Sequence, residues 1–123
     1  MVQQRSMSEA QNGDDPRLME FLREKVNSFV RWDLIRFFHD NPYTINTAEA
    51  IAQYTGRDAR TVETELLGLV DANVLRMKQS GTTTLFGYTA DANARALVEQ
   101  FLLACDNREF RKRAIHQVLN GMR

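Results

Sequence analysis

Four polar residues near the middle of the 123-residue chain could carry out recognition chemistry: Arg57, Arg60, Thr61 and Thr64. An arginine guanidinium can donate two parallel hydrogen bonds to guanine, and a threonine can bond a phosphate or pack its methyl group on thymine. When a helix lies in the major groove of DNA, its first turns reach the base edges. These residue types therefore suit DNA readout, and they also fit an ordinary solvated helix surface.

Two short helices joined by a tight turn are predicted to position these residues. Thr47 suits the N-cap of a helix from Ala48 to about Tyr54. Gly56 can adopt positive φ where that helix stops, and Asp58 can cap the next helix almost at once. The pattern predicts a helix-turn-helix whose second helix covers about residues 58–73. One face of this second helix is apolar and consists of Val62, Leu66, Leu69 and Val70.

A β-hairpin is predicted directly after the second helix. From Val74 to Lys78 apolar and basic residues alternate, which predicts a half-buried strand with Leu75 and Met77 on its inner face. The return strand is predicted from Leu85 to Tyr88. The connector between the strands is rich in turn-forming residues, namely Gln79, Ser80, Gly81, Thr82 and Thr83.

The N-terminal flank of this central stretch is predicted to be helical. Pro16 suits a first helical position with Asp14 or Asp15 as the cap, and apolar residues then follow helical spacing. The spacing allows one long helix, or two helices with a break near Asn27–Ser28. Helical structure must end before Pro42, because proline disfavours the helical conformation of the preceding residue.

The C-terminal flank is predicted to hold two more helices. Thr89 is predicted to cap the first, and the second covers about Arg108 to Leu119. The fold class is therefore mainly α with a small β-hairpin wing and additional N- and C-terminal helices. Apolar residues of the flanks exceed what one face of so small a domain is expected to cover, which predicts a homodimer through the terminal helices. These residues are Phe21, Leu22, Phe29, Phe101, Leu102, Leu103 and Phe110.

The central stretch TAEAIAQYTGRDARTVETELLGLVDANVLRMKQSGTTTLFGYT, from Thr47 to Thr89, resembles known regulators. It is similar to bacterial and archaeal winged helix-turn-helix transcriptional regulators, the broad group of the arsenical-repressor-like and multiple-antibiotic-resistance-regulator-like families. The resemblance implies a homodimer built from the terminal helices. It also implies that the four recognition residues face the groove and that the wing lies beside phosphates. The wing residues concerned are Lys78, Gln79, Ser80, Thr82 and Thr83.

Composition fits one small soluble domain. Hydrophobic residues make up 43% and charged residues 26%, close to the globular average. Residues 1–15 are polar and aperiodic, which predicts a disordered tail before a domain over 16–123. No long apolar run or signal-like N-terminus is present, so neither a membrane partner nor export is expected, and a cytoplasmic location is the default. The formal net charge is zero, and residues 57–123 carry the positive excess.

Residues that could support catalysis or bind a metal are sparse. His39 and His116 are far apart and lack partners at metal-ligand spacing, and no glycine-rich phosphate loop is present. Cys105 lies on an apolar helical stripe and is read as a small buried hydrophobe. We therefore expect no enzyme activity, metal or cofactor.

A sequence-specific DNA-binding transcriptional regulator is the leading functional interpretation. The alternative is a winged-helix protein–protein interaction module that does not bind DNA, because Glu63 and Glu65 place carboxylates on the recognition helix. Positive potential over Arg76 and Lys78 together with the recognition arginines favours the first interpretation, and a large apolar surface favours the second. No motif identifies an effector ligand.

Overall fold

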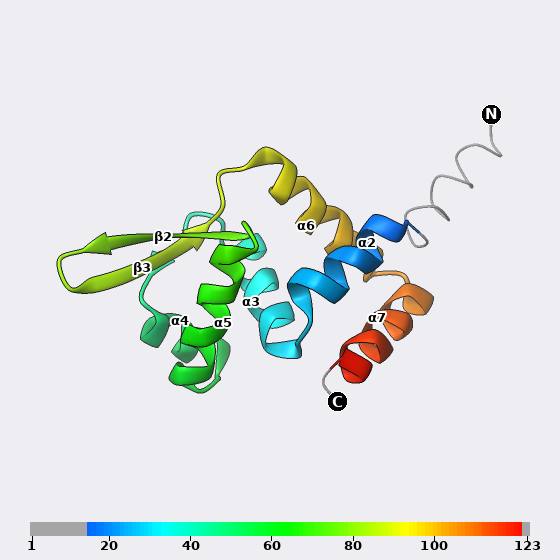
Figure 1. The fold of residues 1–123 in the computed structure, drawn as a ribbon, viewed down its shortest axis with the longest axis horizontal. Coiled ribbons are helices and arrows are strands. Elements are labelled where there is room, and N and C mark those ends of the chain that lie inside the picture. The colour runs from blue at the N-terminus through cyan, green and yellow to red at the C-terminus, as the bar shows by residue number, and fades with distance from the viewer. Residues whose placement is uncertain (1–14, 122–123) are drawn as a thin grey trace.

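The computed structural model describes residues 15–121, and these are mainly helical with one small antiparallel sheet (Figure 1). None of the helices in this range is long and apolar enough to span a bilayer. The predicted disorder of residues 1–15 falls, apart from Asp15, outside the described residues. In chain order the elements are α2 (Pro16–Phe21), the π-helix η1 (Leu22–Val26), α3 (Phe29–Asp40), β1 (Ile45–Asn46), α4 (Ala48–Thr55), α5 (Ala59–Asp71), β2 (Leu75–Ser80), β3 (Thr83–Tyr88), α6 (Ala92–Ala104) and α7 (Arg108–Gly121).

The N-terminal flank forms two helical segments, α2 with η1 and then α3, separated at Asn27–Ser28 as the spacing allowed. Asp15 caps α2 and Pro16 is its first residue, and α2 continues directly into η1. Asn27 ends η1 in the left-handed conformation with φ of 46°, and the Ser28 side chain accepts a hydrogen bond from the Arg31 backbone N–H at 3.1 Å. Ser28 thereby caps α3, which ends at Asp40 as Pro42 requires.

The predicted pair of central helices and its caps are confirmed. The Thr47 hydroxyl accepts from the Ala50 backbone N–H at 3.2 Å at the start of α4. Gly56 adopts φ of 70° where α4 ends, and the Asp58 carboxylate accepts from the Thr61 N–H at 3.0 Å where α5 begins. Three residues, Gly56–Asp58, therefore separate α4 from α5.

The sheet has the strand order β1-β3-β2, with both pairs antiparallel. Leu75 pairs with Tyr88 at one end of the hairpin and Ser80 with Thr83 at the other, so the turn contains only Gly81 and Thr82. The prediction of a five-residue connector was wrong, because Gln79 and Ser80 continue β2 and Thr83 begins β3.

The prediction that β2 is half buried is correct only at its base. Leu75 is buried, whereas Met77 is 51% exposed. The reason is that the hairpin extends past the helices into solvent, at the end of the molecule opposite α7 (Figure 1). Alternating residue types therefore set two faces of the strand, and only the first inward residue has helices to pack against.

Asp91, and not Thr89 as predicted, caps α6. The Asp91 carboxylate accepts from the Asn93 N–H at 3.0 Å, and α6 begins at Ala92. Thr89 is buried instead, because its N–H continues the strand with a bond to the Val74 carbonyl at 3.1 Å. Its hydroxyl accepts from the Asp91 N–H at 3.2 Å and so holds the cap residue in place.

The terminal helices pack onto their own chain. Phe21, Trp32 and Phe110 surround Phe101, with ring centroids at 5.5, 5.4 and 6.2 Å from it. Most of the apolar residues that motivated a dimer are thus buried within one chain, and Leu103 is the one that is largely exposed, at 63%. The premise of surplus apolar surface was wrong, because the aromatic side chains of α2, α3, α6 and α7 fill a shared core.

Candidate nucleic-acid interface

The first turns of α5 present Arg60, Thr61 and Thr64 to solvent. Within residues 15–121 the Arg60 guanidinium has no hydrogen-bond or ion-pair partner. The Thr61 hydroxyl donates to the Asp58 carboxylate at 3.1 Å, and the Thr64 hydroxyl donates to the Arg60 carbonyl at 3.1 Å. Phosphate oxygens only accept hydrogen bonds, so both threonines would have to rotate their hydroxyls to bond a phosphate. In their present orientation they offer methyl groups and acceptor oxygens.

The Asp58 carboxylate is held at the start of α5 by the groups that it caps. The Thr61 backbone N–H and hydroxyl both donate to it and lower the pKa of Asp58 below its usual value. Asp58 therefore remains an anion at neutral pH. Its charge lies at the positive end of the α5 dipole, where a carboxylate is favourable.

Arg57 differs from Arg60 because its guanidinium is already bonded. Its Nε donates to the Asp33 carboxylate on α3 at 2.9 Å, and its backbone N–H bonds the Ala52 carbonyl at 3.0 Å. The second bond closes the C-terminal cap of α4 next to Gly56. Arg57 thus joins the α4–α5 turn to α3, and its charge is compensated by Asp33.

Glu65 is turned toward the body of the protein. Its carboxylate accepts from Arg31 Nε at 2.8 Å, and Arg31 Nη1 also donates to the Lys25 carbonyl at the end of η1 at 3.1 Å. The Arg31 guanidinium lies against Gly68, where an added Cβ would come within 1.9 Å of its Nη2. Glu63 and Glu65 are the two α5 carboxylates that disfavour DNA binding. Only Glu63 is exposed and lacks an ion-pair partner among the described residues.

The hairpin presents its polar residues on both faces. The register places Arg76 opposite Gly87 and Lys78 opposite Leu85, so both cations lie on the face of the sheet that points away from the core. A Cβ built on this glycine would make ordinary van der Waals contacts, 3.4 Å from an Ile45 side-chain carbon and 3.7 Å from Arg76 Nε. Neither cation has an ion-pair partner within residues 15–121.

The other residues predicted for the wing are exposed at the far end of the hairpin. Gln79 lies on the other face, where its carbonyl oxygen accepts from the Thr84 hydroxyl. Ser80 and Thr83 form the last cross-strand pair, on the same face as Lys78, and Thr82 is in the turn. The structure thus places all five predicted wing residues together, with one cation among them.

The base of the hairpin is anchored by Tyr88 and Arg95. The Arg95 guanidinium lies 4.6 Å from the centre of the Tyr88 ring, and its Nε donates to the Thr89 carbonyl at 2.6 Å. The Tyr88 hydroxyl is buried with no hydrogen-bond partner among the described residues, and burial raises the pKa of Tyr88. Cation–π and apolar contacts therefore hold the base of the hairpin against α6.

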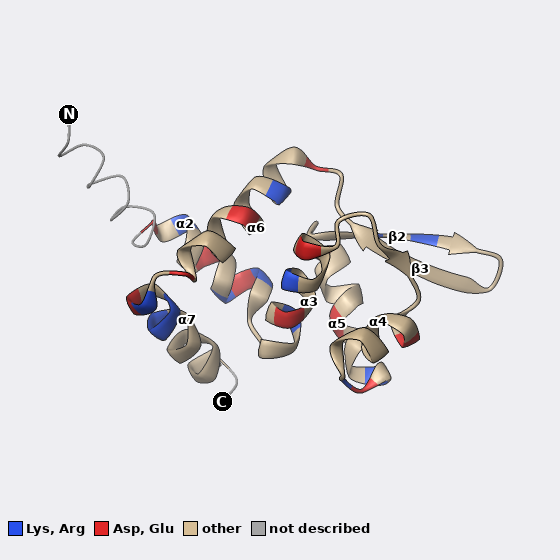
Figure 2. Cartoon of the chain, turned by 180° about the vertical axis from the view of Figure 1, so that it is seen from behind, with Lys and Arg blue, Asp and Glu red and all other residues tan. Residues whose placement is uncertain are grey.

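Part of the positive excess of residues 57–123 lies on α7, away from α5 and the hairpin. Figure 2 shows blue segments both on α7 and on β2, at opposite ends of the molecule. Four of the C-terminal cations, Arg108, Arg111, Lys112 and Arg113, belong to α7. These four cations of the positive excess in residues 57–123 therefore do not add to the surface formed by α5 and the hairpin.

Other chemistry-bearing residues are scattered. His39 Nδ1 lies 3.3 Å from the Asp40 carboxylate and its Nε2 lies 3.7 Å from that of Glu99. Cys105 is buried, and burial raises the pKa of its thiol to about 11. Within residues 15–121 no group of three or more His, Cys, Asp or Glu side chains is arranged to hold a metal ion.

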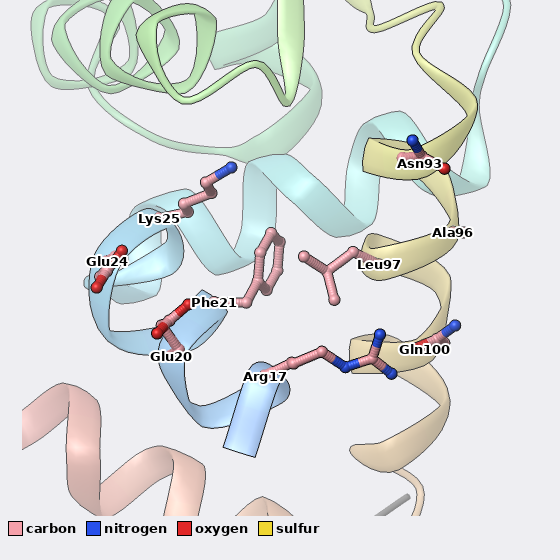
Figure 3. A pocket seen from close by; sticks show the side chains of 9 residues that line it. All are labelled: Arg17, Glu20, Phe21, Glu24, Lys25, Asn93, Ala96, Leu97 and Gln100. Carbon is pink, nitrogen blue, oxygen red and sulfur yellow. The ribbon is translucent and has the colours of Figure 1, made fainter. Parts of the chain in front are cut away.

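A cavity of about 460 Å³ separates α2 and η1 from α6 (Figure 3). Phe21 and Leu97 face one another across it, and Arg17 reaches toward Gln100. Glutamates and a lysine share its rim, so its charge is mixed. Nothing in this arrangement selects one class of ligand.

Two exposed tyrosines are a feature that the sequence did not reveal. Tyr43 is 94% exposed, and Tyr54 is 65% exposed although its ring stacks on Phe37 at 5.8 Å. Tyr43 lies in the loop between α3 and β1, and Tyr54 of α4 lines one groove together with Ile45 of β1. Helical spacing predicts which residues share a face, but it does not indicate that a neighbouring element leaves that face uncovered.

Comparisons of the chain with protein-family models, with curated proteins and with solved structures find no significant match. The functional argument therefore depends on the chain's own residues. What the geometry brings together is one helix start and one hairpin at the same end of the molecule, with Arg60, Arg76 and Lys78 exposed.

Proposed function

We propose that the chain is a DNA-binding transcriptional regulator of the winged helix-turn-helix class. In this proposal α5 enters the major groove and the hairpin β2–β3 is the wing on the phosphate backbone. The order of the elements supports it, because α4, a three-residue turn and α5 are followed by a hairpin whose strand β3 also pairs with β1. The length of α5, with 13 residues, suits a helix that lies in a groove.

The observation that carries the proposal is the set of uncompensated cations. Arg60, Arg76 and Lys78 have no ion-pair partner among residues 15–121. The carboxylates of Asp33 and Glu65, by contrast, are neutralised by Arg57 and Arg31. On α5 and the hairpin, Arg31 neutralises Glu65, so three unpaired cations stand against the two unpaired carboxylates of Glu63 and Asp71 among the described residues. The surface therefore keeps a positive excess of one charge, which favours a polyanion.

The same geometry assigns different roles to the cations. Arg60 projects from the first turn of α5, the position that reaches base edges, and its guanidinium can bond guanine in two places. Arg76 and Lys78 lie on the hairpin, where they would neutralise phosphates. Each phosphate neutralised contributes about −0.9 to the slope of log K against log salt concentration, so two give about −2.

Selection of binding sites from a randomised DNA library, followed by titration at several salt concentrations, tests the proposal. Arg60→Ala should cost about 1–3 kcal/mol and relax the preference at one position of the site. Lys78→Ala should weaken binding to all sequences alike and reduce the magnitude of the salt slope by about one. Lys112→Ala is the matched control, because it removes a cation from α7 at the other end of the molecule.

The interaction-module alternative has one observation in its favour. Tyr43, Ile45 and Tyr54 are 94%, 53% and 65% exposed near β1 and α4, and Leu67 is 43% exposed on α5. Ile45 and Tyr54 line one groove, and contiguous exposed apolar patches mark surfaces that bind other proteins. If no DNA site can be selected near physiological salt, or if the Arg60 and Lys112 variants bind DNA equally well, this alternative replaces the DNA-binding proposal.

Homodimerisation would have to use a smaller apolar surface than the sequence suggested. Leu103, Ile115 and Leu119 are the large apolar side chains of α6 and α7 that are exposed among the described residues, at 63%, 38% and 50%. Regulators of this class bind paired half-sites as dimers. Light scattering that gives the monomer mass of 14.2 kDa at micromolar concentration would exclude a dimer in free solution.

A further inference from the structure

A second cavity, of about 270 Å³, lies between α3 and α7. Its α3 wall is one helical stripe, because the spacings of three, four and seven residues from Phe29 place side chains on the same face. The two α7 residues are one turn apart and share a face as well. The lining residues are Phe29, Trp32, Asp33, Arg36, Arg111 and Ile115.

The apolar wall of this cavity is aromatic and well supported. The rings of Phe29 and Trp32 are stacked, with centroids 6.1 Å apart and planes 23° apart. Trp32 also packs against Phe101, whose ring centroid lies 5.4 Å from its own. Ile115 adds an aliphatic surface from α7. A flat apolar group can therefore pack here without reordering the core.

The charge available to a ligand in the cavity is positive. Arg36 has no hydrogen-bond or ion-pair partner within residues 15–121. Arg111 uses Nη1 to donate to the Cys105 carbonyl at 2.8 Å, which fixes the side chain and leaves its other N–H groups free to donate. The one carboxylate of the lining, Asp33, is already bonded to Arg57.

We propose that this cavity binds a small organic carboxylate with a single aromatic ring or a similarly compact apolar body. The ring packs on Phe29 and Trp32, and the carboxylate accepts hydrogen bonds from Arg36 and Arg111. A volume of about 270 Å³ lies just below the roughly 300–1,000 Å³ of pockets for drug-sized ligands, which limits the ligand to one ring. The site does not depend on the proposed DNA binding.

Both halves of the ligand contribute to selectivity. A neutral isostere keeps the ring contact but gives the guanidinium groups a poor partner, since charge-assisted hydrogen bonds are about twice as strong as neutral ones. Inorganic phosphate offers charge without an apolar body, so it makes no apolar contact with the residues that line the cavity. The cavity should therefore prefer benzoate over both benzamide and inorganic phosphate.

The chain contains a single tryptophan, and Trp32 lines the cavity. In a nitrogen–proton correlation spectrum of the full chain, the Trp32 indole gives one cross-peak that needs no assignment. Titration with benzoate should shift this peak saturably, with a Kd of roughly 1 mM or below for so small a ligand. Benzamide and inorganic phosphate at equal concentrations serve as the ring-only and charge-only probes.

Two variants and a control decide which side chains are responsible. Arg36→Gln should weaken benzoate binding about tenfold, and Ile115→Glu should abolish it by placing a carboxylate in the cavity. Lys112→Gln removes a neighbouring cation of α7 that does not line the cavity, so it should change the Kd less than twofold.

Four results would overturn the proposal. One is the absence of a saturable shift with benzoate up to roughly ten times the expected Kd. Another is equal affinity for benzamide, which would show that the arginines take no part. The third is an unchanged affinity in both Arg36→Gln and Ile115→Glu, which would place the bound benzoate elsewhere. Phosphate binding as tight as benzoate binding would likewise reject an apolar contact.

Discussion

The contact between α3 and α5 and the hairpin β2–β3 handle charge in opposite ways. In the first region Arg31 bonds Glu65 and Arg57 bonds Asp33, so every one of these charges is matched. In the hairpin Arg76 and Lys78 face solvent with no ion-pair partner among the described residues. The difference shows that the number of charges in a segment does not indicate how many are available to a ligand.

The two regions should also differ in what their charges contribute to stability. The Arg31 and Glu65 side chains are 16% and 23% exposed, so their ion pair is partly shielded from water and costly to break. Exposed cations of the hairpin order no neighbour and lie in solvent, where such charges contribute little to folding. Stability and binding should therefore separate between the regions when single residues are changed.

Arg31→Ala should produce the largest loss of stability. The change leaves the partly buried Glu65 carboxylate and the Lys25 carbonyl without their donor, which should lower the free energy of unfolding by about 2–3 kcal/mol. Urea unfolding followed by circular dichroism measures it. Lys78→Ala is the control and should stay within about 0.5 kcal/mol of the wild type. Equal losses for the two variants would contradict the comparison.

Gly68→Ala tests whether the Arg31 guanidinium needs the space at Gly68. In the wild type an added Cβ displaces that guanidinium and breaks its hydrogen bonds. The cost of the lost bonds exceeds the gain in helix propensity from alanine, so the substitution should lower the free energy of unfolding by about 1 kcal/mol. In the Arg31→Ala background the obstacle is gone, so the same substitution should stabilise by about 0.5–1 kcal/mol. The sign of the effect therefore reverses between backgrounds. The same sign in both would mean that Arg31 is held elsewhere in solution.

Local features of the fold were predictable because their causes lie within a few residues. Thr47 and Asp58 cap helices with side-chain oxygens that bond an N–H three residues on, and Gly56 supplies the positive φ between them. Thr89 was assigned as a cap for the same local reason. Asp91, two residues later, is the cap instead, because the Thr89 N–H bonds the Val74 carbonyl and keeps Thr89 in line with the strand.

The charge state of the site could not be predicted, because it depends on contacts between distant parts of the chain. Asp33 and Arg57 are 24 residues apart, and Arg31 and Glu65 are 34 apart. No periodicity within one helix relates such pairs. Arg57 and Arg60 look equivalent in the sequence, and only the position of α3 distinguishes the bonded arginine from the exposed one.

Arg57→Gln should mainly lower stability, whereas Arg60→Gln should mainly weaken DNA binding. The Arg57–Asp33 pair has side chains that are 33% and 50% exposed, so after solvent screening its loss should cost only about 0.5–1 kcal/mol. Arg60→Gln should leave stability within about 0.5 kcal/mol and weaken DNA binding. Thermal unfolding and retardation of a selected DNA site measure the two quantities. A stability loss for Arg60→Gln that matches the one for Arg57→Gln would remove the distinction between the two arginines.

The smallest expected effect is the pH dependence contributed by the Asp58 cap. Hydrogen bonds from the Thr61 backbone and hydroxyl lower the pKa of Asp58 in the folded chain below its usual value of 3.8. The stabilisation is therefore complete above the unfolded pKa and is lost as the pH falls through the lower, folded pKa. Asp58→Asn retains an oxygen acceptor for the cap without a titrating group. The difference in Tm between wild type and Asp58→Asn should be constant above about pH 5. Below about pH 4 the Tm of the wild type should fall more than that of Asp58→Asn. Parallel Tm profiles down to about pH 3 would show that the carboxylate does not hold the start of α5 as an anion.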